Sequence, residues 1–236
     1  MNTDWFAVID GTWPAARITR AGPFRLREGR GGGQRVSAAS AEGPFTEADI
    51  DAAEAAMRDM GQPRIFMIRP GEDALDAALA ARGYPVVDPV NVHACPSAQL
   101  TDIPIPRVTV FALWEPLAIM REIWAQGGIG PGRLAVMERA PGPKTGLLAR
   151  HRDKPGGVGF VAIHAGTAMV HAVEILPHQR RQGLGRWMMR AAAFWAVENG
   201  ADTLSVICTQ ANTAANGLYA ALGMEVVGAY HYRRLD

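Results

Sequence analysis

The chain has 236 residues, enough for one large domain or two small ones, each with its own apolar core. A formal net charge of +1, with 20% charged residues, gives no overall field that would attract nucleic acid or an acidic membrane. The two cysteines, Cys95 and Cys208, define neither a disulfide framework nor a metal site. With no apolar run of about 18 residues and no leader pattern, we expect a cytoplasmic protein without metal, membrane or nucleic-acid partners.

The first half predicts a strand, a helix and a second strand in succession. Within residues 64–69, the four residues between the two arginines are apolar and include two β-branched isoleucines, which favours a strand. The alanine- and leucine-rich segment that begins at Asp73 favours a helix. Gly83 is placed to end that helix, and Val86-Val87 begins the next strand.

A proline-punctuated segment divides the chain. Residues 94–106 contain three prolines and lack helical periodicity, so they are interpreted as a linker. The predicted organisation is an N-terminal domain over 1–98, a linker over 99–106 and a C-terminal domain over 107–236.

The second half opens with a predicted strand over 108–112 and a helix over 114–126, which Gly127-Gly128 ends. Trp124 lies on the apolar stripe of that helix, which favours burial. Further strand-like runs follow at 146–150, 157–164 and 167–176.

The most informative segment follows the last of these runs. Pro177 ends the strand, and Arg180-x-x-Gly183-x-Gly185 then opens a long helical pattern. A glycine-bearing turn at a helix N-terminus collects free N–H groups and the positive end of the helix dipole. The segment therefore predicts an anion site that suits a phosphate or a pyrophosphate. Glycine at both positions would let such a ligand approach the backbone.

The order of the remaining elements narrows this interpretation. A helix over 184–199 stops at Gly200, and a strand over 203–209 follows. Asn212 then begins a second helix containing Leu218-Tyr219-x-x-x-Gly223.

In this combination the sequence resembles the GNAT superfamily of acetyl-CoA-dependent N-acetyltransferases. The resemblance is clear over roughly 157–232 and extends from about 107. It implies an α/β fold with a mixed twisted sheet flanked by helices. It also implies acetyl-CoA as cosubstrate, without a metal. Met224 departs from the aromatic residue that often follows the glycine in the family.

The first half repeats part of this pattern. Gly83 and Gly223 lie 140 residues apart, and so do Val86 and Val226. We therefore expect two GNAT-like lobes from a duplicated unit, the C-terminal one complete. Leu79 stands where Tyr219 would be, and Gly43 and Phe45 fall opposite Gly183 and Gly185, which indicates a degenerate N-terminal copy. Alanine-rich helices that resemble one another by composition alone are the competing explanation.

The resemblance assigns the cofactor contacts mainly to backbone groups. The amide near Ile175 and Leu176 would polarise the thioester carbonyl, and Asn212 would cap its helix and contact the pantetheine arm. The pyrophosphate would be held by the turn of Arg180, Arg181, Gln182, Gly183, Leu184, Gly185 and Arg186.

Three residues are candidates for proton transfer. Tyr219 is implied as the acid that protonates the leaving thiolate, since a phenol is close to a thiol in acidity. His171 and Glu174 are both candidate bases, with His171 ahead and His164 a distant third. Alternation along a strand should turn His171 and Glu174 to opposite faces unless a bulge shifts the register.

The predicted function is acetyl transfer from acetyl-CoA to a primary amine, in a small molecule or a peptide, by direct attack in a ternary complex. The alternative is a non-catalytic, CoA-binding regulatory module, against which the retention of Tyr219 argues. A nucleotide-binding protein is a remote third reading, because a P-loop lysine is missing. The sequence leaves the acceptor unidentified, the acyl-chain length undetermined and a homodimer open.

Overall fold

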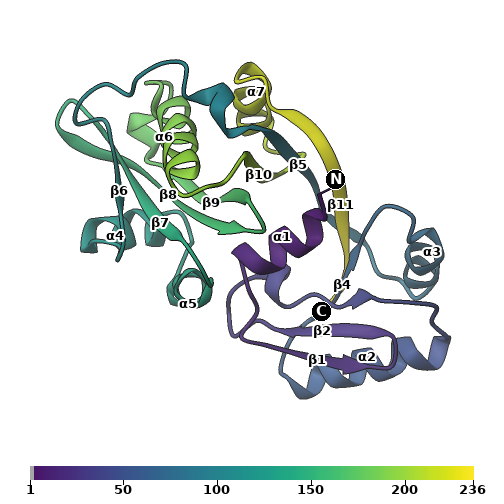
Figure 1. The fold of residues 1–236 in the computed structure, drawn as a ribbon. Helices are drawn as coiled ribbons and strands as arrows, with labels where there is room; N and C mark the ends of the chain where they lie inside the picture. Colours follow the sequence, from purple (N-terminus) through teal and green to yellow (C-terminus); the bar gives the residue numbers. More distant parts are fainter. Residues whose placement is uncertain (1–2) are drawn as a thin grey trace.

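The computed structural model describes residues 3–236, which form two lobes joined by a long sheet (Figure 1). The helices are α1 (Trp5–Thr12), α2 (Glu47–Asp59), α3 (Asp73–Ala81), α4 (Ala118–Gln126), α5 (Pro131–Arg139), α6 (Leu184–Glu198) and α7 (Thr213–Ala221), with 3₁₀ turns η1 (Gln34–Val36), η2 (Ser97–Leu100) and η3 (Pro177–Gln179). The strands are β1 (Arg17–Ala21), β2 (Phe24–Glu28), β3 (Ser40–Ala41), β4 (Arg64–Ile68), β5 (Val86–Pro96), β6 (Val110–Leu113), β7 (Lys144–His151), β8 (Lys154–His164), β9 (Thr167–Ile175), β10 (Thr203–Thr209) and β11 (Glu225–Leu235).

In the main sheet, each half of the chain contributes one strand to the part formed by the other half. Its order is β4-β11-β5-β10-β9-β8-β7-β6. Strand β5 of the first half therefore lies beside β10 of the second half, and β11 of the second half lies beside β4 of the first. Only β9 and β10 run parallel, while every other neighbouring pair is antiparallel. The α/β class with a mixed sheet flanked by helices is confirmed.

The two exchanged strands pair in the same register. Val206 of β10 lies opposite His93 of β5, and Phe66 of β4 lies opposite Arg233 of β11. Phe66 corresponds to Val206, and His93 corresponds to Arg233, each at an offset of 140 positions. The strand–helix–strand order β4-α3-β5 recurs as β10-α7-β11, with a glycine of positive φ after each helix. The predicted repeat of the strand–helix–strand order is thus present. Each repeat, however, forms its part of the sheet together with a strand from the other repeat.

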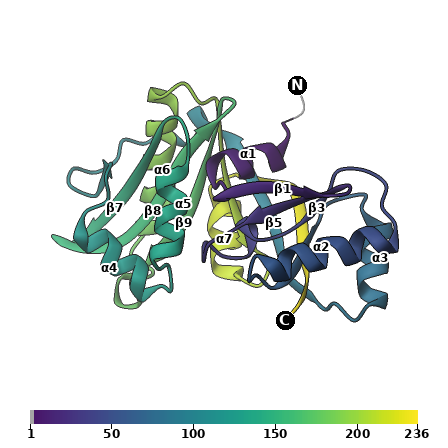
Figure 2. The ribbon, with the colours of Figure 1, turned by 90° about the horizontal axis from the view of Figure 1, so that it is seen from below.

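Helices cover both faces of the sheet. On one face, α6 and α7 pack on β7–β10 in a core that includes Leu184, Met188 and Tyr219. On the other face, α4 and α5 enclose Trp124 and Phe160. Helix α1 continues this second layer over β8 and β9, and it lies between the two lobes (Figure 2). An N-terminal segment is thereby placed against the strand that carries the candidate bases.

Three local expectations differ from the structure. The helix predicted from Trp114 begins at Ala118, because Pro116 restrains the residue before it to extended backbone. Helix α5 was missed, although Pro131 at its first position is a helix-start signal. The first residues of the predicted linker, up to Pro96, belong to β5, whose ladder they complete opposite β10.

Candidate functional site

The site residues predicted from the sequence surround the point where β9 and β10 separate. The two parallel strands are paired from Thr203 opposite Thr167 to Val206 opposite Val170. Beyond Val170, β9 continues to Ile175, while β10 is paired only with β5. Backbone groups that face the gap between the two strands can therefore bind an extended ligand.

A bulge reorients β9 just past this point. Ala172 has a φ of 51°, and the pairing with β8 shifts between Phe160 opposite His171 and Val158 opposite Glu174. One extra residue in a strand moves the side-chain alternation by one position. His171 consequently contacts α1, and Glu174 contacts the end of α4 on the same face of the sheet. Because of this bulge, His171 and Glu174 lie on the same face of the sheet, which simple alternation along a strand would not allow.

His171 is buried and both of its ring nitrogens have partners. Arg35 Nη1 donates to Nδ1 over 3.0 Å, so the Nε2–H of His171 donates to Thr12 Oγ1 over 2.8 Å. The Thr12 hydroxyl in turn donates to the Val8 carbonyl over 2.7 Å. Burial, together with the nearby Arg35 charge, holds the pKa of His171 well below its usual range. The imidazole is therefore neutral, and its unprotonated nitrogen is occupied, which disfavours a role as general base.

Glu174 retains access to solvent. Its side chain is 22% exposed, and the carboxylate pairs with Arg180 Nη2 at 3.4 Å. Arg180 also donates from Nε to the Ile175 carbonyl over 3.1 Å. Gly127 leaves the space that Glu174 occupies, since a Cβ there would lie 2.6 Å from Glu174 Cγ. The predicted arginine therefore positions the carboxylate at the open end of β9.

Tyr219 lies on the opposite face, in the core beneath α6. It is 4% exposed, and its hydroxyl makes no hydrogen bond within residues 3–236. Burial raises its pKa, so the phenol stays protonated and serves as a donor rather than a base. The His93 ring packs 5.2 Å from the Tyr219 ring, and His93 Nε2 contacts Asn216 Oδ1 on the same helix at 2.9 Å.

The predicted anion loop presents free amides at the start of α6. Arg181 and Gly183 both adopt left-handed backbone, with φ of 62° and 79°. No backbone carbonyl of residues 3–236 accepts from the amides of 181–186. The first intrahelical donor of α6 is Trp187, which bonds to Gly183. Free amides at the positive end of a 15-residue helix form an anion site.

The side chains of this loop divide by exposure. Arg181, Gln182 and Arg186 are exposed, whereas Leu184 and Gly185 are buried. A Cβ on Gly185 would lie 2.8 Å from Leu218 Cδ2. Gly185 thus allows α6 to pack on α7, in addition to any approach of a ligand. Gly183 is required by its positive φ, since a Cβ there would meet Trp187 Nε1 only at an ordinary contact distance of 3.8 Å.

Only one of the two amides predicted to polarise the carbonyl is free. The Leu176 amide donates to the Gly156 carbonyl over 3.0 Å, which removes Leu176 from that role. Because successive strand amides point to opposite sides, the Ile175 amide faces the gap left by β10. Asn212 caps α7, where its side chain accepts from the Ala215 amide over 3.1 Å.

The corresponding place in the first half is closed to an anion. A Cβ-bearing residue, Thr46, caps α2, and its hydroxyl accepts from the Asp49 amide while the Asp49 carboxylate accepts from the Thr46 amide. Arg69 Nη2 donates to the Ala41 carbonyl, just beyond the parallel bridge between Ala39 and Phe66 of β4. A cavity of about 630 Å³ remains there, lined in part by Phe45. The helix begins three residues later than the predicted alignment of Gly43 with Gly183 requires, because Thr46 supplies the cap.

Several residues near the site could not be found from local patterns. Arg35 and Thr12 reach His171 from the first half, and His93 reaches Tyr219 from an exchanged strand. No motif relates these positions in sequence. Burial raises the pKa of Cys95 to about 11, and burial also raises that of Cys208.

Comparison with known proteins identifies the fold and the family. Residues 118–224 match the Acetyltransferase (GNAT) family, and this span holds the separated strands, the anion loop and Tyr219. The chain carries a GNAT-family acetyltransferase domain. The protein is therefore an acyltransferase.

Relatives extend the similarity to nearly the whole chain. A Bacillus subtilis (strain 168) protein named "Uncharacterized N-acetyltransferase YobR" is 26% identical over 231 residues, covering 94% of each chain. A GCN5-related N-acetyltransferase from Kribbella flavida has the same fold, with a TM-score of 0.68, 21% identity and coverage of 96% and 91%. A tandem GNAT protein from the clavulanic acid biosynthesis pathway matches with a TM-score of 0.60 and 14% identity, covering 84% and 74%. Within residues 3–236, no helix has the length and apolar character that crossing a bilayer requires.

Proposed function

We propose that this GNAT enzyme transfers an acetyl group from acetyl-CoA to a primary amine by direct attack in a ternary complex. The observation that carries the proposal is the gap between β9 and β10, which ends at the free amides of 181–186. Glu174 and Tyr219 lie on opposite faces of the sheet beside that gap. An extended thioester with a pyrophosphate at one end fits this arrangement.

The chain supplies the functions that aminolysis of a thioester requires. The amides of 181–186 bind the pyrophosphate, and the Ile175 amide stabilises the carbonyl oxygen as it gains charge. Asn212 keeps α7, and so Tyr219, in place at the side of the thioester.

Proton transfer is divided between two residues. Glu174 accepts a proton from the ammonium, directly or through water, and the freed amine forms a bond to the acetyl carbon. The carbon–sulfur bond then breaks and the leaving thiolate takes the proton of Tyr219, while the nitrogen releases its second proton through solvent, which restores the Tyr219 phenol. Glu174 is preferred to His171 because the imidazole nitrogens already bond to Arg35 and Thr12.

Calorimetry with acetyl-CoA, combined with free-thiol release in the presence of a panel of amines, tests the proposal. We expect Glu174→Gln and Tyr219→Phe to keep acetyl-CoA binding and to lose roughly 100- to 10,000-fold in turnover. Glu198→Gln, at the exposed end of α6, is the matched control and should leave both unchanged.

The other outcomes discriminate among alternatives. Binding of acetyl-CoA without thiol release on any amine would favour the non-catalytic CoA-binding module. Loss of turnover in His171→Gln, with Glu174→Gln fully active, would transfer the role of base to His171. Failure of the wild type to bind acetyl-CoA would refute the proposal as a whole.

A further inference from the structure

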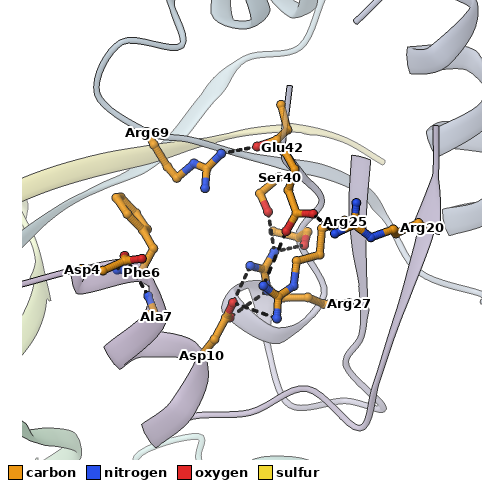
Figure 3. A network of polar contacts seen from close by, with 12 residues as sticks. Asp4, Phe6, Ala7, Asp10, Arg20, Arg25, Arg27, Ser40, Glu42 and Arg69 are labelled. Carbon is orange, nitrogen blue, oxygen red and sulfur yellow. Dashed lines mark hydrogen bonds and ion pairs between the residues drawn. The ribbon is translucent and has the colours of Figure 1, made fainter. Parts of the chain in front are cut away.

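Arg35 of turn η1 has no acidic partner within residues 3–236, in contrast to the arginines of β2. Elsewhere in the first half, Arg27 pairs with Asp10 over 2.8 Å, and Arg25 pairs with Asp10 and Glu42 (Figure 3). The guanidinium of Arg35 instead lies 5.6 Å from the centre of the Trp13 ring and forms no ion pair within residues 3–236.

One nitrogen of this guanidinium is open to a ligand. Nη1 donates to His171 Nδ1. Nε is buried without a partner, whereas Nη2 has no partner within the described residues and is not buried. The planar fork of a guanidinium pairs with carboxylates through charge-assisted hydrogen bonds, and Nη2 is the member of the fork that can form one here.

The place of Arg35 relates this nitrogen to the acetyl-transfer site. Its partner His171 directly follows Val170, the last residue of β9 that pairs with β10. The neighbouring Gln34 donates to Asp88, at the start of β5. Turn η1 therefore links β9 to β5, the strand on the other side of β10. It does so on the face that also carries Glu174.

We propose that Arg35 selects the acceptor, and that the acceptor is an amine that also bears a carboxylate. The inference rests on the proposed acetyl transfer. Glu174 takes the ammonium end, and Nη2 of Arg35 takes the carboxylate, so the two charges of a zwitterion meet opposite charges on one face. A single unpaired guanidinium balances the single charge of a carboxylate, whereas a phosphate monoester would leave about one charge uncompensated. Arg35 is thus a specificity residue contributed by the first half to the site of the second.

The test compares ω-amino acids from glycine to 6-aminohexanoate with alkylamines of the same chain length. We expect wild-type kcat/KM to favour the amino acid at the best chain length by at least roughly tenfold. Arg35→Gln should reduce that ratio by roughly 10- to 100-fold, with alkylamine turnover and acetyl-CoA binding kept. Arg35→Lys should restore part of the ratio, because it keeps the charge and loses the fork. Arg107→Gln, an exposed arginine outside the site, is the control.

Each remaining outcome is decisive. Equal use of amino acids and alkylamines by the wild type would overturn the inference, as would an equal loss on both classes in Arg35→Gln. Acetyl-CoA binding with neither class acetylated would overturn it too, because the series covers every spacing up to six carbons. Absence of acetyl-CoA binding would instead refute the proposed function.

Discussion

In each half of the chain a helix precedes the repeated strand–helix–strand unit, and only in the second half is the N-terminus of that helix open. Helix α6 begins at Gly183 with free amides, whereas α2 begins at Thr46 with a reciprocal cap from Asp49. A side-chain carboxylate in α2 occupies the position that a ligand's phosphate would take at α6. The difference shows that one acidic residue in the first helical turn can convert an anion site into a self-contained structural cap.

Installing the first half's carboxylate in the second half should have the largest effect. Arg186 occupies the third position of α6, as Asp49 does in α2, and its side chain is exposed. Arg186→Asp should weaken acetyl-CoA binding by at least roughly 100-fold in calorimetry, because the carboxylate repels the pyrophosphate while suiting the helix dipole. Arg186→Gln separates this repulsion from the loss of a cation. Unchanged binding in the aspartate variant would contradict the assignment of the anion loop.

The contact between the halves can be disturbed at α5. A Cβ on Gly132 would lie 2.4 Å from the Gly31 carbonyl oxygen, a backbone atom of the segment that leads to Arg35. Gly132→Ala should therefore destabilise the fold by about 1–3 kcal/mol in urea titration and lower kcat/KM for the acceptor. Gly130→Ala, where no atom lies within 4 Å, is the matched control. If Gly132→Ala kept wild-type stability and kcat/KM, the contact between α5 and the segment at Gly31 would not influence acceptor binding.

The polar cluster beneath α3 contains charged side chains, whereas the corresponding cluster beneath α7 contains amides and a histidine. Asp76 bonds to Arg233 and His231, the positions that correspond to Asn216, His93 and Asn91 in the other half. The Arg233 hydrogen bond lowers the pKa of Asp76 from 3.8 to about 2.

Asp76→Asn would make the first cluster resemble the second. Because the pKa of the folded state is lowered, the ionised carboxylate stabilises the fold above pH 4, and this contribution is lost as the pH falls toward 2. With the side chain 30% exposed, we expect a loss of about 1 kcal/mol at pH 7 and no difference near pH 2 in denaturant titrations. An equal loss at both pH values would assign the effect to packing.

Removal of the cap of α2 should have the smallest effect. Thr46→Ala leaves the Asp49 amide without its partner and should lower Tm by about 2–4 °C. Thr46→Ser should retain the wild-type Tm. The calorimetric stoichiometry should remain one acetyl-CoA per chain in both variants, because Asp49 and Arg69 are retained. A second equivalent in Thr46→Ala alone would show that the cap excludes the cofactor.

The parts of the site that the sequence predicted are contiguous in the chain. The turn from Arg180 to Gly185, the cap at Asn212 and the position of Tyr219 follow from spacing, glycine conformation and capping within single βα units. The same signals predicted β10 to the residue and α6 nearly so. The elements that were misplaced have competing local signals, such as Pro116 near the start of α4.

Two features of the site depended on pairing between strands. The bulge at Ala172 arises from the register of β9 on β8, and alternation alone could not place His171 and Glu174 on one face. Likewise, the burial of the Leu176 amide follows from its partner Gly156, which a single strand cannot specify.

By itself, then, the sequence determined the fold class, the family resemblance and the residues proposed to hold a cofactor, because those depend on local backbone conformation and short spacings. The tertiary structure decided which candidate base retains a free proton-accepting group, and it brought Arg35 and His93 to the second half's site. The physical reason is the exchange of β5 and β11, which pairs residues more than 100 positions apart. No local propensity encodes such long-range pairing, which only the completed sheet enforces.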